Sequence, residues 1–256
     1  MSTGQQVNNG VGPVSFARRK VVGALAALGG VAIAPGLVLY EFAQAAPDAG
    51  KSTGASSKVR WGMLIDTTLC TPGCTACVDA CRTENGLGPV TRATDVQWIR
   101  KVELKDRKTG AVQSAPVMCQ HCAEPPCVDV CPTGASFKRA DGIVLVDRHT
   151  CIGCRYCVMA CPYMARSFVH EPITEQKTEV PRGKGCVESC TLCVQRVDRG
   201  STPACVEACT AIDKGAMVFG DLNDPQSDIA RRIRARASVQ IRADLRLDTG
   251  VRYQGL

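Results

Sequence analysis

The sequence predicts an α+β fold whose interior is organised by cysteine rather than by a large hydrocarbon core. Three observations predict it: 17 cysteines in 256 residues, aromatic residues at only 4%, and short β-branched runs separated by Gly and Pro. The length allows one or two domains. Hydrophobic residues at 45% and charged residues at 21% are ordinary for a globular protein. This composition excludes an intrinsically disordered chain and a polytopic membrane protein.

The first 46 residues have the features of an export signal. Arg18 and Arg19 precede residues 21–39, a moderately apolar run without charge, and Ala43–Ala45 offers small residues for cleavage. This pattern resembles a twin-arginine signal, which predicts a location at the periplasmic face of the cytoplasmic membrane. An uncleaved anchor is the alternative, because 19 apolar residues could just span a bilayer. Residues 47–60 are expected to form a flexible tether.

Sixteen of the cysteines fall into four groups of four, separated by short gaps. The groups are Cys70, Cys74, Cys77 and Cys81; Cys119, Cys122, Cys127 and Cys131; Cys151, Cys154, Cys157 and Cys161; and Cys190, Cys193, Cys205 and Cys209. Cys186 is left over. We expect it to be a buried or free thiol, and to be the substitute ligand if Cys190 were displaced.

The third group has the spacing C-x2-C-x2-C-x3-C-P, which is the run that bacterial ferredoxins use for [4Fe–4S] clusters. Three closely spaced thiolates can wrap one cluster. A fourth lies about one helical turn further along and faces a neighbouring cluster. The first group departs from this spacing, because Thr71–Gly73 puts three residues between its first two cysteines. A Pro-Gly turn can absorb the extra residue, and a [3Fe–4S] centre is the alternative there.

Other uses of cysteine fit the pattern less well. Disulfide bridges are disfavoured by an odd cysteine count and by gaps of only two or three residues. Structural zinc usually takes paired C-x2-C knuckles with longer spacers, and only the fourth group resembles that. Covalent haem needs C-x-x-C-H, which occurs nowhere in the chain.

From residue 61 to 225 the sequence resembles the four-cluster ferredoxin-like electron-transfer subunits that accompany molybdopterin oxidoreductases and quinone-linked membrane complexes. The resemblance implies two nested bacterial-ferredoxin-like modules: an outer one (61–94 with 186–225) and an inner one (112–170), with a β-hairpin insertion (95–118). It also implies four ligand sets, in which the fourth cysteines are exchanged within each module. These are set 1 (Cys70, Cys74, Cys77, Cys209), set 2 (Cys81, Cys190, Cys193, Cys205), set 3 (Cys119, Cys122, Cys127, Cys161) and set 4 (Cys131, Cys151, Cys154, Cys157).

The implied function is electron transfer by an exported subunit. Within the family the chain is most similar to the iron–sulfur subunit of the Dsr complex of sulfur metabolism. The expected partners are a polytopic quinone-reactive membrane subunit and either a multihaem cytochrome c or a molybdopterin catalytic subunit; a diffusible polyferredoxin is a further alternative. The chain has no dinucleotide fingerprint, phosphate-binding loop or H-E-x-x-H motif, so we expect no catalytic site of its own.

Nucleic acid is not an expected partner. The formal charge is +7, but no basic stripe interleaves with aromatic residues, and four oxidised clusters with their thiolates would add about −8. Arg155 and Glu124 are candidates for tuning cluster potentials, with plain surface charge as the alternative. His121 and His149 are expected to form local hydrogen bonds.

The remaining segments provide a scaffold. A β-hairpin is expected with arms at 98–104 and 111–118, and short strands at 62–66, 141–147 and 216–220. The tail, residues 226–256, is expected to lie outside the cluster domain. Its arginine-rich stretch 228–247 is predicted to begin as an amphipathic helix, either a solvated surface helix or a docking element for a membrane partner.

Overall fold

The structure is a computed structural model that describes residues 30–34, 37–40, 55–212 and 215–256, in two units, Met1–Ala49 and Gly50–Leu256. In the first unit β1 (Gly30–Ala34) pairs with β2 (Leu37–Tyr40) in antiparallel fashion. The predicted Arg18, Arg19 and cleavage site lie outside the described residues. No helix in the described part of the chain is both long and apolar enough to span a bilayer.

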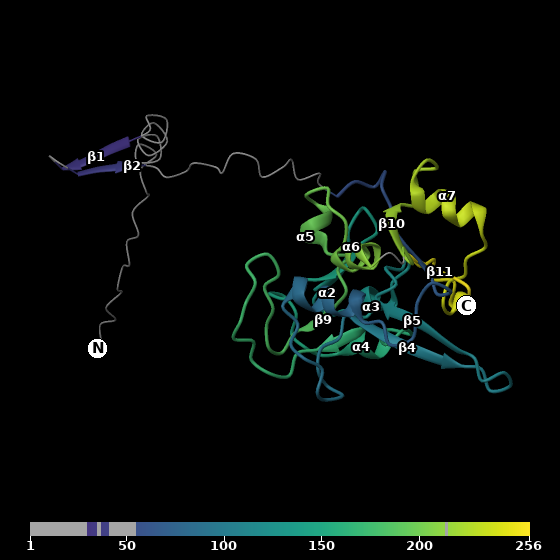
Figure 1. Cartoon of the computed structure of the whole chain (residues 1–256). Helices are drawn as coiled ribbons and strands as arrows, with labels where there is room; N and C mark the ends of the chain where they lie inside the picture. The colour runs from purple at the N-terminus through teal and green to yellow at the C-terminus, as the bar shows by residue number, and fades with distance from the viewer. Residues whose placement is uncertain (1–29, 35–36, 41–54, 213–214) are drawn as a thin grey trace, which may run out of the picture. The chain divides into compact units, whose positions relative to one another are not determined.

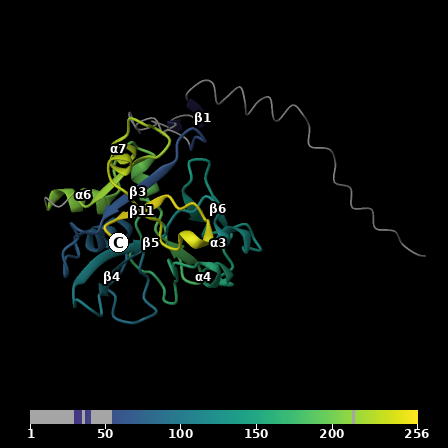
Figure 2. The ribbon, with the colours of Figure 1, turned by 90° about the vertical axis from the view of Figure 1, so that its right-hand side faces the viewer.

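The second unit contains a three-stranded sheet in the order β10-β3-β11 (Figures 1 and 2). The central strand is β3 (Trp61–Asp66), and β10 (Met217–Asp221) pairs with it in antiparallel register. Met63 and Ile65 on β3 are fully buried. The strands predicted at 62–66 and 216–220 are therefore confirmed, and residues more than 150 positions apart in the sequence form one sheet.

The third strand of this sheet corrects the expectation for the tail. Residues Val251–Gln254 form β11, which pairs in parallel with β3. Val251 and Tyr253 are fully buried. Figure 2 shows this strand, in yellow, beside β3. The predicted boundary at residue 225 therefore cuts off a strand of the central sheet.

The helix predicted to begin in the tail is short. It spans α7 (Asp228–Ala235), and Ser227 caps it by accepting a hydrogen bond from the Ala230 N–H at 3.2 Å. A single 3-10 turn, η2 (Ala243–Leu245), follows. Arg242 and Arg246 on either side of that turn have positive φ angles of 56° and 52°, which no continuing α-helix can contain.

The predicted hairpin is confirmed. Its arms are β4 (Ile99–Lys105) and β5 (Val112–Met118), and it projects from the body of the unit in Figure 1. At the turn, Asp106 Oδ1 accepts hydrogen bonds from the N–H groups of Lys108 at 2.7 Å and Thr109 at 3.1 Å.

Short helices and strand pairs complete the unit. The helices are α2 (Ala76–Asn85), α3 (Pro126–Asp129), α4 (Tyr156–Ala160), α5 (Val194–Val197) and α6 (Ala204–Ala211). The strand pairs are β6 (Ser136–Lys138) with β7 (Val144–Val146), and β8 (Arg166–Phe168) with β9 (Val187–Ser189). The strand predicted at 141–147 is confined to β7, because Asp141 and Gly142 form the preceding turn.

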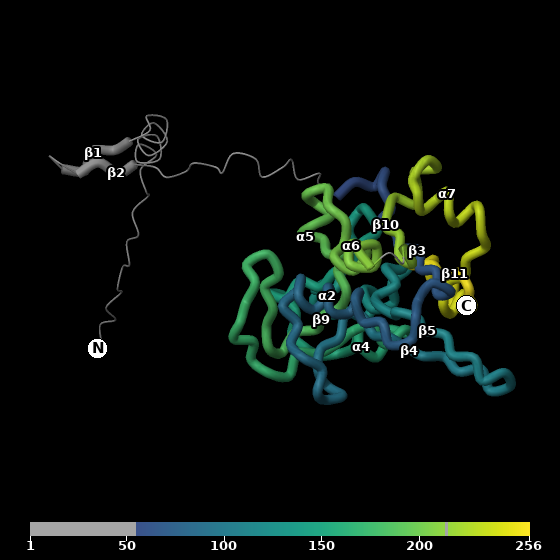
Figure 3. Tube along the Cα trace, in the orientation of Figure 1, coloured from purple at the N-terminus to yellow at the C-terminus, as the bar shows by residue number. Residues whose placement is uncertain are grey.

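The packing of two helix pairs shows how the inner module is inserted between the two halves of the outer module. In the outer module α2 packs against α6, and in the inner module α3 packs against α4. Figure 3 shows α2 and α6 side by side although they are far apart along the tube. The core beside them is mixed, because cysteines are buried together with Met63, Trp98 and Tyr253.

Candidate functional site

The third and fourth cysteines of every group are four residues apart and lie on, or directly after, a short helix. Helix α2 carries Cys77 and Cys81, and α6 carries Cys205 and Cys209. The equivalent pairs in the inner module are Cys127 with Cys131 beside α3, and Cys157 with Cys161 beside α4. A spacing of four places both thiols on one helix face but one turn apart. The two thiols can therefore serve two adjacent sites.

The residue before the second cysteine of every group has a left-handed backbone conformation. These residues are Gly73, His121, Gly153 and Leu192, with φ angles of 76°, 45°, 70° and 51°. A left-handed residue turns successive N–H groups into a concave nest that binds anions and iron–sulfur sulfides. Gly73 has the same conformation as its three counterparts. The extra residue in group one therefore does not change the backbone conformation before the second cysteine.

The four cysteines of set 1 line one small pocket together with Lys101. Lys101 on the hairpin reaches the long loop of group one, where its Nζ donates to the carbonyls of Thr71 at 3.2 Å and Cys74 at 2.9 Å. Burial raises the pKa of Cys77 to about 11, and the Lys101 charge opposes that rise. The hairpin thus supplies a cation beside a predicted anionic centre.

The four cysteines of set 3 line a second small pocket, which Arg166 also borders. Burial raises the pKa values of Cys119 and Cys122 to about 12. Such thiols stay protonated at neutral pH unless a metal compensates the thiolate charge. The two pockets are therefore lined by thiols whose environment disfavours bare thiolates.

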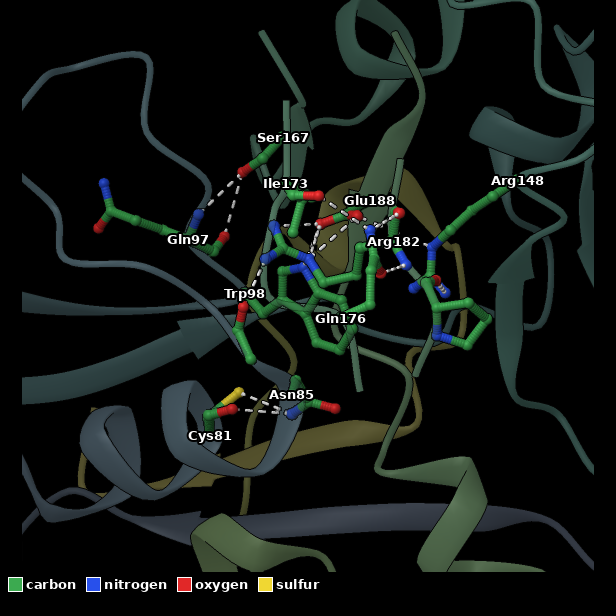
Figure 4. A network of polar contacts seen from close by, with 12 residues as sticks. Cys81, Asn85, Gln97, Trp98, Arg148, Ser167, Ile173, Gln176, Arg182 and Glu188 are labelled. Atoms are coloured by element: carbon green, nitrogen blue, oxygen red, sulfur yellow. Dashed lines mark hydrogen bonds and ion pairs between the residues drawn. The ribbon is translucent and has the colours of Figure 1, made fainter. Parts of the chain in front are cut away.

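All four cysteines of set 2 are buried. The pKa of Cys81 is raised well above its usual value, first by burial and then by the charges of Cys190 and Cys193. The pKa of Cys205 is raised by burial and by the charges of Cys193 and Cys81. Asn85 Nδ2 donates to the Cys81 carbonyl at 2.8 Å and to Cys81 Sγ at 3.6 Å, as Figure 4 shows.

Set 4 is the least enclosed of the four. Cys131 and Cys151 are half-buried, Cys154 is exposed, and only Cys157 is buried. The Ser136 N–H donates to Cys131 Sγ at 3.3 Å. Burial acts to raise the pKa of Cys131, but hydrogen-bond donors from Ser136 and its neighbours outweigh this effect and lower that pKa.

Neighbouring sets are close enough for their thiols to affect one another, and this places the sets in an order. Cys77 of set 1 raises the pKa of Cys205 in set 2. Cys119 of set 3 raises that of Cys190 in set 2, and Cys157 of set 4 raises that of Cys127 in set 3. The order is therefore 1-2-3-4.

The donor set fits polynuclear clusters. None of the 17 cysteines is joined in a disulfide, and in residues 55–212 and 215–256 no three His, Cys, Asp or Glu side chains converge on one point suited to a single ion. Thiols spaced around a cavity instead suit a cluster that is bound at its corners, with four cysteines for each [4Fe–4S] unit.

Comparisons with known proteins agree with this geometry. Two family matches, each described as a 4Fe-4S dicluster domain, cover residues 110–222 and 69–135. The chain is 42% identical to the Hdr-like menaquinol oxidoreductase iron-sulfur subunit 1 of Archaeoglobus fulgidus over 227 residues, 78% of this chain and 84% of that protein. The chain belongs to the family of ferredoxin-like iron–sulfur electron-transfer subunits.

Two further relatives carry different names. This iron–sulfur subunit is 43% identical to a tetrathionate reductase subunit of Salmonella typhimurium over 176 residues, which cover 68% of this chain and 63% of that protein. It is 41% identical to protein NrfC of Escherichia coli over 190 residues, 73% of this chain and 77% of that protein.

The predicted accessory residues have different outcomes. Arg155 and Glu124 are exposed, and the Arg155 guanidinium lies 4.4 Å from the centre of the Phe168 ring. His121 is buried and its Nδ1 accepts a hydrogen bond from the Val144 N–H at 3.0 Å, so the expected local bond is confirmed. The side chain of His149 is exposed, and its backbone N–H donates to Asp147 Oδ1 at 2.8 Å, so the expectation for its imidazole stays a prediction.

The thiols of Cys186 and Cys190 have different cysteine neighbours, so the structure does not favour Cys186 as the substitute for a displaced Cys190. The Cys186 thiol is buried, as expected, and donates to the Arg148 carbonyl at 3.2 Å. Its thiol neighbour is Cys151 of set 4. The Cys190 thiol instead faces Cys193, Cys205 and Cys119. Strand β9 separates Cys186 from Cys190 and directs the two thiols toward different sets.

Sequence reasoning missed a buried charge network beside set 2, which Figure 4 shows. Glu188 on β9 is fully buried and pairs with Arg182 at 2.9 Å and with Arg148 at 3.8 Å. It also accepts a hydrogen bond from Trp98 Nε1 at 3.4 Å, and Arg182 Nη1 donates to the Gly86 carbonyl at 2.6 Å. No sequence signal predicted this network, because its members come from four separate segments.

Proposed function

We propose that this subunit holds four [4Fe–4S] clusters, one in each of sets 1 to 4, and relays electrons from one end of the series to the other. The observation that carries the proposal is the order of the sets together with their exposure. Sets 2 and 3 are almost wholly buried, whereas Cys70 and Cys74 of set 1 are half-buried and Cys154 of set 4 is exposed. Buried centres between two accessible ones suit a relay with a contact point at each end.

Bound clusters would supply one-electron redox centres. The chain itself holds the thiols at successive helix turns, which keeps neighbouring sites close, and electron tunnelling falls steeply with distance. It also excludes water from the middle of the series, and it places cations and N–H donors next to sulfur, which tunes reduction potentials.

An iron assay tests the cluster count. Purified anaerobically, the holo-protein should contain about sixteen iron atoms, four for each of four clusters. Redox titration followed by electron paramagnetic resonance should resolve four centres. About eight iron atoms in a normally folded protein would contradict four clusters, and one centre with a three-iron signal would point to a [3Fe–4S] cluster at set 1.

For the complex, we propose a Dsr-type assembly in which the protein exchanges electrons with a polytopic quinone-reactive membrane subunit, beside a multihaem cytochrome c. The relative named as a menaquinol oxidoreductase subunit supports a quinone-linked complex. The relative named as a tetrathionate reductase subunit supports a second candidate, a periplasmic molybdopterin oxidoreductase. Purification from gently solubilised membranes separates the two by the co-purifying subunit. A protein that emerges alone is better described as a diffusible polyferredoxin.

Export by the twin-arginine route is the last part of the proposal, and it rests on Arg18 and Arg19. Replacing both with lysine should retain the protein in the cytoplasm with its clusters assembled. Fractionation followed by immunoblotting measures this, with Arg107→Lys at the exposed hairpin turn as a control that should leave export unchanged. Undiminished accumulation outside the cytoplasm would contradict the twin-arginine interpretation.

A further inference from the structure

Arg166 is a buried cation that lies between two ligand sets. It begins β8 and is only 4% exposed. Its guanidinium faces the thiols of Cys119 and Cys127 in set 3 and of Cys157 in set 4, and it borders the pocket of set 3. One positive charge is therefore shared between two neighbouring sites.

Among the described residues no carboxylate pairs with this charge. Arg166 Nη1 donates to Ser136 Oγ at 2.5 Å, while Nε and Nη2 are buried without an oxygen or nitrogen partner in the described part of the chain and have the thiols of Cys127 and Cys157 as their polar neighbours. Other inward-facing arginines differ: Arg182 pairs with Glu188, and Arg139 pairs with Asp141 and Asp198. An unpaired buried cation is costly, so this side chain needs a negative group in the space that the thiols surround.

The backbone holds Arg166 firmly in this position. It is the register partner of Ser189 on β9, and Ser189 directly precedes Cys190 of set 2. The strand pair β8-β9 thus joins the inner module to the outer one at this residue. A side chain anchored in that way keeps its position relative to both neighbouring sets.

We propose that Arg166 is the charge-compensating residue of sets 3 and 4, and that its guanidinium raises the reduction potentials of the clusters held there. The inference rests on the proposed function, since it needs clusters in both sets. A cluster with four thiolates is already anionic, and reduction adds a further negative charge. A fixed buried cation therefore stabilises the reduced state more than the oxidised state.

Redox titration of the full-length holo-protein, followed by electron paramagnetic resonance, tests the proposal. In Arg166→Gln, two of the four cluster signals should move to lower potential. Each should lose about tenfold or more in the equilibrium constant for one-electron reduction, a shift of about 59 mV. The other two signals should stay in place. Arg166→Lys, which keeps the charge, should shift the same two signals less.

Arg139→Gln is the matched control, because it removes an inward-facing arginine whose charge is already paired with carboxylates. It should leave all four potentials unchanged. If Arg166→Gln keeps its iron and all four potentials, or shifts all four alike, the inference is overturned while the relay itself stands. A wild-type protein without four clusters would instead overturn the proposed function.

Failure of Arg166→Gln to load iron is also informative. If the charge is what matters, Arg166→Lys still assembles all four clusters and Arg166→Gln loses about half of its iron, the share of sets 3 and 4. Equal iron loss in both variants would assign Arg166 a packing role and overturn the inference.

Discussion

The outer and inner modules share one pattern of cysteines but have different scaffolds. The outer module is built on the three-stranded sheet β10-β3-β11 and on helices of ten and eight residues. The inner module has two-stranded pairs and helices of four and five residues. Set 2 of the outer module is fully buried, whereas set 4 of the inner module includes an exposed cysteine. The cysteine spacing therefore directs local ligand geometry, while the surrounding sheet decides how well a site is enclosed.

The largest expected difference between the modules appears when iron is removed. Helices of four or five residues are not stable alone, and the free energy of metal binding is also free energy of folding. In the apo-protein, amide exchange across residues 119–168 should accelerate, by roughly tenfold or more relative to β3. Hydrogen exchange read by mass spectrometry measures both regions. Equal acceleration in β3 would show that the outer module depends on its clusters just as strongly.

Removing one ligand from each module should sharpen the comparison. Cys205→Ala opens a fully buried set, so we expect loss of iron beyond one cluster, together with a lower melting temperature. Cys154→Ala affects an exposed loop and should cost about four of about sixteen iron atoms, with the fold retained. Iron content and near-ultraviolet circular dichroism measure the two variants. A similar loss in both would mean that exposure does not set the consequence.

Tyr253 and Tyr156 form a matched pair of tyrosines from the two parts of the unit. Tyr253 on β11 is fully buried, donates to the Pro116 carbonyl at 3.1 Å and accepts from Gln120 Nε2 at 3.2 Å. Tyr253→Ala should lower the free energy of unfolding by about 3–5 kcal/mol. Tyr156 in the inner module is 55% exposed, so Tyr156→Ala should change it by less than about 0.5 kcal/mol. Denaturant unfolding of the holo-proteins measures both, and a small effect at Tyr253 would show that β11 contributes little.

The smallest effect concerns α7, the helix at the start of the tail. Ser227 caps α7 and its hydroxyl also donates to the Asp221 carbonyl at 2.7 Å, so Ser227→Ala should cost about 1 kcal/mol of stability. Thr75 precedes α2 without a side-chain cap to the helix backbone, and Thr75→Ala should cost less. Equal losses of stability in the two variants would mean that the Ser227 cap does not stabilise α7 more than an uncapped residue would.

Much of the fold could be predicted because it is local. The spacing of the cysteines indicated one helical turn between the third and fourth cysteine of a group, and the β-branched arms indicated the hairpin. The part that failed depends on distant partners: the tail from residue 226 was separated from the domain, yet Val251 and Tyr253 are buried beside β3. The four residues of β11 alternate between apolar and polar side chains as many short segments do, and this pattern does not indicate which strand they pair with.

The candidate site was also predictable only in its local part. The sixteen cysteines were identified from spacing, but the side chains that surround them were not. Arg155 and Glu124 were selected because they neighbour cysteines in the sequence, and both are exposed. Lys101 and Arg166, which face thiols, come from strands outside the four cysteine groups.

The sequence by itself determined the kind of ligand, the grouping of the thiols and the one-turn offset within each group. Those properties depend on a few consecutive residues and on the fixed rise of a helix. Tertiary structure alone decided the order of the four sets, their gradient of exposure, and which cation lies between them. Burial and electrostatic contact depend on which segments meet in space, and chain segments separated by a hundred residues meet only once the whole unit has packed.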